Sequence, residues 1–144
     1  MERSLRSARV ELLDQCLVVE DDSIIRLDLE ETLRGFGLKN VHGASTLEAA
    51  TAIIASSPIR FAVLDYVIGS SNTVAVAEVL AARGVPTLFL TAHGKSVELP
   101  AGLAHLQVLS KPFSSDLLAA AILKELAALT PPPDGDACEG RCCV

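Results

Sequence analysis

Residues 16–22 read Cys-Leu-Val-Val-Glu-Asp-Asp, four apolar residues that run directly into three acidic ones. A continuous apolar run of this length predicts a strand that is buried on both faces, as in a parallel sheet. The pattern then changes over residues 23–36, where apolar residues recur every three to four positions and predict a helix that ends at Gly35 and Gly37. The chain therefore opens with a strand followed by a helix.

The same alternation continues along the rest of the chain. Ser45 and Glu48 have the spacing of a capping box at the start of a second helix. Five strands alternating with helices predict an α/β fold, a flavodoxin-like doubly wound five-stranded parallel sheet with helices on both faces. The further strands are predicted at residues 40–44, 60–64, 86–91 and 106–110, and the further helices at residues 45–57, 73–83 and 114–129.

The composition is that of one acidic globular domain. The chain has 144 residues, of which 50% are hydrophobic and 21% charged, and its net charge is −6. This length fits one domain, and an acidic balance argues against a nucleic-acid-binding protein, which normally presents a basic face. No apolar stretch approaches the roughly 20 residues of a membrane span, and no secretory signal is evident. We therefore expect a cytoplasmic protein without nucleic-acid or membrane partners.

Polar residues and prolines divide the chain into three predicted segments. Residues 1–14 form a charged N-terminal arm, residues 15–129 the folded domain, and residues 130–144 a flexible tail with three consecutive prolines near its start. The tail also contains three clustered cysteines, and their position at one end argues against a disulfide framework. Because no second domain follows in this sequence, we expect the folded domain to act by docking on other proteins.

Polar side chains follow the predicted strands at the point where each ends. Glu20 and Asp21 follow the first strand, Asp65 the third, Thr91 the fourth and Lys111 the fifth. In doubly wound domains the working site lies beyond the carboxyl ends of the strands. Crowded carboxylates favour a cation such as Mg²⁺, while a lysine and a hydroxyl can bind further anionic oxygens. Since an aspartate can form an aspartyl phosphate, this set of residues suits phosphoryl transfer to a carboxylate.

Four short motifs resemble the receiver domain of bacterial two-component response regulators. They are Leu-Val-Val-Glu-Asp-Asp at 17–22, Val-Leu-Asp at 63–65, Leu-Thr-Ala at 90–92 and Ser-Lys-Pro-Phe at 110–113. The resemblance covers residues 15–128, and it depends on the order of the motifs because each of them alone is common. It implies a single-domain response regulator that works in a phosphorelay with a sensor histidine kinase.

The resemblance also implies a role for each candidate site residue. Asp65 would accept the phosphoryl group from a phosphohistidine of the kinase, Lys111 would pair with the phosphoryl oxygens, and Thr91 would be the switch hydroxyl that binds the phosphoryl group. The Lys111–Pro112 peptide bond would be cis. The ligands of Mg²⁺ would be Asp21 and Asp65 directly, Glu20 through water, and the backbone carbonyl of Val67.

Several positions depart from the common receiver pattern. Val108 stands where many members carry a Tyr or Phe that moves with the switch hydroxyl. Two glycines and a proline interrupt residues 92–105, so we expect the fourth helix of the family to be short or irregular. Residues 89–94, Phe-Leu-Thr-Ala-His-Gly, resemble the atypical stand-alone receivers of alphaproteobacteria, although three positions differ from their usual Phe-Ala-Thr-Gly-Tyr. The roles of Tyr66 and His93 stay open.

The sequence leaves more than one function open. The protein is a messenger that docks on an unknown downstream protein, a phosphate sink that drains a kinase, or a pseudo-receiver that binds partners without being phosphorylated. An aspartate phosphatase would need a second acid two residues after its nucleophile, where this chain has Val67. We expect no enzyme activity on a separate substrate, only self-catalysed phosphoryl transfer and loss. A homodimer is also open, through the N-terminal arm or through an apolar stripe on the last helix, formed by Leu118, Ile122, Leu126 and Leu129.

Overall fold

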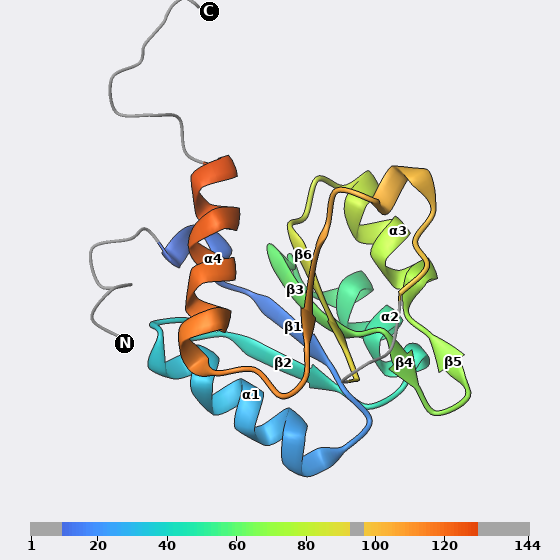
Figure 1. Cartoon of the computed structure of the whole chain (residues 1–144), viewed down its shortest axis with the longest axis horizontal. Coiled ribbons are helices and arrows are strands. Elements are labelled where there is room, and N and C mark those ends of the chain that lie inside the picture. Colours follow the sequence, from blue (N-terminus) through green and yellow to red (C-terminus); the bar gives the residue numbers. More distant parts are fainter. Residues whose placement is uncertain (1–9, 93–96, 130–144) are drawn as a thin grey trace, which may run out of the picture.

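The structure, a computed structural model, describes residues 10–92 and 97–129 (Figure 1). The predictions for the first nine residues, for His93 and for the tail lie outside the described residues. Within the described part, five parallel strands form one sheet in the order β2-β1-β3-β6-β7. Their bounds are Cys16–Val19 (β1), Val41–Ala44 (β2), Phe61–Asp65 (β3), Thr87–Thr91 (β6) and Gln107–Ser110 (β7).

The α-helices of the described part cover the sheet in two pairs. Helices α1 (Ser23–Gly35) and α4 (Ser115–Leu129) lie on one face, and α2 (Leu47–Ser56) and α3 (Val74–Ala82) on the other (Figure 1). This arrangement confirms the predicted doubly wound α/β fold. Among these helices, none is both long enough and apolar enough to cross a membrane.

Two connections differ from a regular strand–helix alternation. Between β6 and β7, the described residues contain a 3-10 turn at Ala101–Leu103 and no α-helix, as expected from the interrupted sequence. Between β3 and α3, the chain forms a small antiparallel hairpin of β4 (Val67–Ile68) and β5 (Ser71–Asn72). This hairpin was not predicted.

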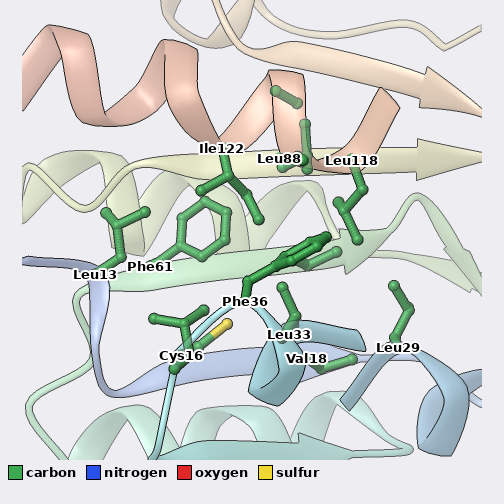
Figure 2. Packing of buried hydrophobic residues seen from close by; sticks show 14 of the residues in the cluster. Leu13, Cys16, Val18, Leu29, Leu33, Phe36, Phe61, Leu88, Leu118 and Ile122 are labelled. Atoms are coloured by element: carbon green, nitrogen blue, oxygen red, sulfur yellow. The ribbon is translucent and has the colours of Figure 1, made fainter. Parts of the chain in front are cut away.

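The central strands divide their side chains between two apolar clusters, one on each face of the sheet. Cys16 and Val18 of β1 pack toward α1 and α4, whereas Leu17 and Val19 pack toward α2 and α3. Because both faces are buried, the strand reads as an unbroken apolar run in the sequence. Figure 2 shows the first cluster, in which Leu29 and Leu33 of α1 and Leu118 and Ile122 of α4 surround Phe36, Phe61 and Leu88.

Three of the helices begin at a residue whose side chain accepts hydrogen bonds from the first turn. Asp22 caps α1 by accepting from the backbone N–H of the residues two and three positions later. Ser114 caps α4, because its hydroxyl accepts from Leu117 N–H at 3.1 Å. The capping box predicted from Ser45 is wrong. Thr46 caps α2 instead, with its hydroxyl accepting from Ala49 N–H at 3.0 Å.

The packed part of the chain begins before the predicted domain boundary. The 3-10 turn Val10–Leu13 contacts α4, and Leu13 is fully buried in the core. Asp14 then holds the start of β2, because its Oδ1 accepts hydrogen bonds from the backbone N–H of Lys39 at 3.0 Å and of Asn40 at 2.9 Å. Residues just before β1 therefore belong to the folded body of the protein.

The apolar stripe of the last helix lies in the core of the same chain. Leu118, Ile122 and Leu126 are between 1% and 4% exposed and belong to the cluster between the sheet, α1 and α4. A homodimer through these side chains would require the core to open. These three side chains therefore stabilise the fold of the single chain.

Asp14→Ala is expected to lower the free energy of unfolding at pH 7 by about 1 kcal/mol, because two backbone donors lose an acceptor that water only partly replaces. Burial opposes the ionisation of Asp14, but hydrogen bonds from the backbone of Asn40, Lys39 and Gln15 outweigh it and lower the pKa of this carboxyl. A lowered pKa stabilises the folded state above the ordinary value of about 3.9, and this stabilisation is lost as the pH falls through the folded-state value.

Urea unfolding at pH 7 and at pH 3 measures this contribution. The difference in free energy of unfolding between the unaltered protein and Asp14→Ala should be smaller at pH 3 than at pH 7. An equal difference at both pH values would contradict a role for the ionised carboxylate.

Candidate functional site

Three carboxylates meet at the carboxyl end of the two central strands. β1 lies next to β3 in the sheet, so Glu20 and Asp21, which follow β1, are neighbours of Asp65, the last residue of β3. One carboxylate oxygen from each of the three lies within 4.8 Å of the others. The structure therefore brings together the acids that the sequence singled out.

Lys111 places a positive charge among these acids from the far side of the sheet. It follows β7, and its side chain reaches back past β6, where Nζ lies 2.8 Å from Glu20 Oε1 and 3.2 Å from Asp65 Oδ2. Glu20 is 2% exposed and Asp65 8% exposed, so water reaches neither carboxylate well. Charges buried to this degree are tolerated when they are both paired and hydrogen-bonded, and Lys111 satisfies both conditions.

The ionisation of Glu20 and Lys111 reflects this shared burial. Burial raises the pKa of Glu20 and the nearby charge of Asp65 adds to the rise, while the Lys111 ammonium and the N–H of Asp22 oppose it without cancelling it. Burial disfavours the protonated form of Lys111, but the hydrogen bond to Glu20 and the charges of Asp65 and Glu20 outweigh it and raise the pKa of Lys111. The lysine is therefore a permanent cation at neutral pH.

Asp21 is the carboxylate of this group that faces solvent. Its Oδ2 accepts a hydrogen bond from Gly69 N–H at 2.9 Å, and this bond is the main cause that lowers the pKa of Asp21. Three oxygen donors within reach of one another, with one open to water, form a ligand set that suits Mg²⁺ with its remaining positions filled by water. The residues present therefore fit a divalent cation.

The other predicted site residues surround this group. Thr91 is buried at the end of β6, and its carbonyl oxygen accepts a hydrogen bond from Lys111 N–H at 2.7 Å. Val67 begins β4, two residues after Asp65. The Lys111–Pro112 peptide bond is cis, as expected. The switch role of Thr91 and the metal-binding role of the Val67 carbonyl stay predictions.

Two side chains that sequence reasoning missed hold the backbone of the site. Thr73 is fully buried, and its hydroxyl donates to the carbonyl of Asp65 at 2.8 Å. A threonine before a helix reads as a simple N-cap, but Thr73 makes no such side-chain bond to α3. Arg26 donates from Nη1 to the carbonyl of Glu20 at 3.0 Å. In the sequence, this contact was indicated only by the position of Arg26 in the first turns of the helix that follows the acids.

Tyr66 connects the residue after Asp65 with the irregular segment between β6 and β7. Its hydroxyl donates to the carbonyl of Glu98 at 3.1 Å, and its ring packs edge-to-face on Phe89 with ring centroids 6.0 Å apart. The sequence left the role of this tyrosine open, and the structure shows it as a bridging residue. Val108 lies exposed on the edge strand β7, and as a valine it provides no aromatic ring at the position that is aromatic in many receivers.

A family model described as the response regulator receiver domain matches residues 16–123. A search of curated proteins found no match. Among solved structures, the chain is similar to SdrG from Sphingomonas melonis Fr1, at 35% identity and a TM-score of 0.67, over 78% of this chain and 98% of that one.

Two further solved structures show the same architecture. A response regulator receiver protein from Sinorhizobium medicae WSM419 is 26% identical with a TM-score of 0.68, over 80% of this chain and 95% of that one. A mutant of the anti-anti-sigma factor PhyR from Bartonella quintana is 23% identical with a TM-score of 0.68, over 86% of this chain and 51% of that one. The likeness to PhyR is one of fold alone.

Lys111→Met is expected to destabilise the protein at pH 8 in the absence of divalent cations by about 1–3 kcal/mol. The loss is smaller than the ~3–5 kcal/mol of a fully buried pair because water reaches part of Lys111. The pKa of Glu20 is raised in the folded protein, so its ionised form lowers the free energy of unfolding at high pH, and protonation removes this effect as the pH falls through the folded-state pKa. Without Lys111, the ionised carboxylate lacks its partner. The free energy of unfolding that Lys111→Met loses should therefore be smaller at pH 5 than at pH 8.

Chemical unfolding at the two pH values tests this, with the exposed Lys124→Met as the matched control. Lys124→Met should change stability little at either pH. A loss for Lys111→Met that does not depend on pH would show that the lysine acts through packing and not through its charge.

Proposed function

The chain belongs to the response regulator receiver domain family, and from this membership we propose that it is the phosphoryl-accepting module of a phosphorelay. Asp65 takes the phosphoryl group from a phosphohistidine of a sensor histidine kinase, with Mg²⁺ as cofactor, and the protein signals by docking on a downstream protein. The observation that carries the proposal is the Lys111 ammonium, which joins Asp65 to Glu20 beside the solvent-facing Asp21.

The proposed step needs little covalent help from the protein. A carboxylate oxygen of Asp65 forms a bond to phosphorus while the phosphorus–nitrogen bond of the phosphohistidine breaks, and the electron pair stays on the imidazole nitrogen. In-line placement and neutralisation of the phosphoryl oxygens are the main requirements of such a transfer. Lys111 supplies a fixed positive charge within 3.2 Å of the acceptor, and Thr91 supplies a hydroxyl at the end of the neighbouring strand.

Mg²⁺ would be held by Asp21 and Asp65, by Glu20 through water, and by the backbone carbonyl of Val67. When bound, the ion neutralises charge on the phosphoryl oxygens. Thr73 supports this arrangement, because its bond to the carbonyl of Asp65 fixes the backbone from which the acceptor projects. The intact set of acids and lysine argues against a pseudo-receiver.

The surface beside Asp65 supports a protein as phosphoryl donor. Helix α1 exposes Ile24 and Leu27, which are 79% and 54% exposed. A groove of about 490 Å³ next to them is lined by Ile25, Lys111 and Phe113 among others. Apolar side chains next to a charged acceptor suit a protein surface that excludes water during transfer. A kinase donor also places the proposed site of action in the cytoplasm.

Incubation with acetyl phosphate and MgCl₂ should add one phosphoryl group to the unaltered protein, measured by intact mass. Asp65→Asn should add none, because the amide is not a nucleophile of this kind. Asp116→Asn, which changes an exposed acid at the start of α4, should be phosphorylated like the unaltered protein. Chelation of Mg²⁺ with EDTA should abolish the gain.

Phosphorylation of Asp65→Asn to the same extent as the unaltered protein would rule out Asp65 as the acceptor. A folded protein that gains no phosphoryl group from acetyl phosphate or from phosphoramidate would favour the pseudo-receiver. Once phosphorylation is established, the decay of the added mass separates a slow messenger from a fast phosphate sink.

A further inference from the structure

The hairpin that follows Asp65 contacts the opposite side of the site. Its strands pair Val67 with Asn72 and Ile68 with Ser71, so the loop between them consists of Gly69 and Ser70 alone. Gly69 N–H donates to Asp21 Oδ2 at 2.9 Å across 48 positions of sequence. The tip of the hairpin is therefore attached to the one carboxylate of the group that faces solvent.

The base of the hairpin is fixed to the acceptor strand. Thr73 donates from its hydroxyl to the carbonyl of Asp65 and from its N–H to the carbonyl of Tyr66 at 3.0 Å. Ile68 is 7% exposed and packs into the cluster beneath α2 and α3. Because both its base and its inner side are anchored, the hairpin holds Gly69 N–H at a set place relative to Asp65.

The turn places Gly69 in a backbone conformation that favours glycine. Gly69 has φ +58°, in the left-handed region that favours glycine, and it stands at the first position of a two-residue loop, where glycine is the usual residue of a type II′ turn. An added Cβ would meet nothing within 4 Å. Substitution of Gly69 therefore alters the backbone without a steric clash.

We propose that the hairpin Val67–Asn72 is a positioning element for the divalent cation, and that Gly69 N–H binds one oxygen of Asp21 so that the other is presented to the ion. The inference rests on the proposed function. A solvent-facing carboxylate otherwise samples several rotamers, and ordering it costs binding free energy each time the ion binds. Gly69 is a positioning residue, because it acts on the cation through Asp21.

Gly84 provides a matched control for the strain of substitution. It also has a positive φ, of +74°, and an added Cβ there would likewise meet nothing within 4 Å. Its N–H donates to the carbonyl of Ala81 at the end of α3, away from the acidic group. Gly69→Ala and Gly84→Ala should therefore lose similar amounts of stability, because both place a side chain at a positive φ. Only Gly69→Ala should alter the hydrogen bond to Asp21.

The test is a titration of the ¹⁵N-labelled full chain with MgCl₂, followed by NMR, together with thermal unfolding in EDTA. Gly69→Ala should raise the Mg²⁺ dissociation constant about fivefold, as expected for the loss of one hydrogen bond to the carboxylate. Gly84→Ala should stay within about twofold of the unaltered protein. Both variants should show a similar fall in melting temperature.

A second variant separates backbone conformation from the loss of glycine itself. Asn tolerates a positive φ in such turns, so Gly69→Asn should fold and keep the Mg²⁺ dissociation constant within about twofold of the unaltered protein. A rise in the Mg²⁺ dissociation constant as large as that of Gly69→Ala would contradict the role given to the turn.

The remaining outcomes distinguish this inference from the proposed function. Mg²⁺ binding that Gly69→Ala leaves unchanged, or that Gly84→Ala weakens equally, would overturn the inference alone. No Mg²⁺ binding by the unaltered protein, or binding that Asp21→Ala leaves intact, would overturn both.

Discussion

The arrangement of the sheet depends on one contact, in which the Lys111 ammonium lies between the poorly exposed carboxylates of Glu20 and Asp65. The Lys111 ammonium hydrogen-bonds both Glu20 and Asp65, which lie nearly buried at the carboxyl edge of the sheet. These residues come from the ends of β1, β3 and β7, so the contact requires the intervening strand β6 to be paired in one register with its neighbours on both sides. The charge contact thus depends on the sheet, and the burial of Glu20 depends on the charge contact.

The two apolar clusters make that register reliable. Since side chains of each central strand alternate between the faces, a shift by one residue would move every member of one cluster into the other. At the carboxyl edge of the sheet the apolar runs of β1 and β3 end, and the acids occur there. The backbone around them is tied from both sides, by Arg26 at Glu20 and by Thr73 at Asp65.

The sequence predicted the parts that repeat a simple physical pattern and missed those that depend on single contacts. Buried strands read as apolar runs, and from the order of those runs the sequence alone predicts Asp65 and Lys111 at the same edge of the sheet. The hairpin at residues 67–72 was missed because its strands are two residues long, although the Gly-Ser pair between them is a known turn signal. Thr46 was missed as a cap because Ser45, with Glu48 three residues later, has the capping-box spacing and Thr46 does not. The burial of Leu13 depends on α4, more than a hundred positions away, and no local pattern reports such a contact.

The bridging position of Tyr66 has a practical consequence. The chain contains no tryptophan and this single tyrosine, so its emission arises from one ring when it is excited at wavelengths that phenylalanine does not absorb. That ring adjoins Asp65 in sequence, packs on Phe89, and is hydrogen-bonded to Glu98. A phenol whose hydroxyl leaves a carbonyl acceptor for water changes its emission yield. The unlabelled protein therefore carries its own optical probe of changes at Asp65 and in the segment between β6 and β7.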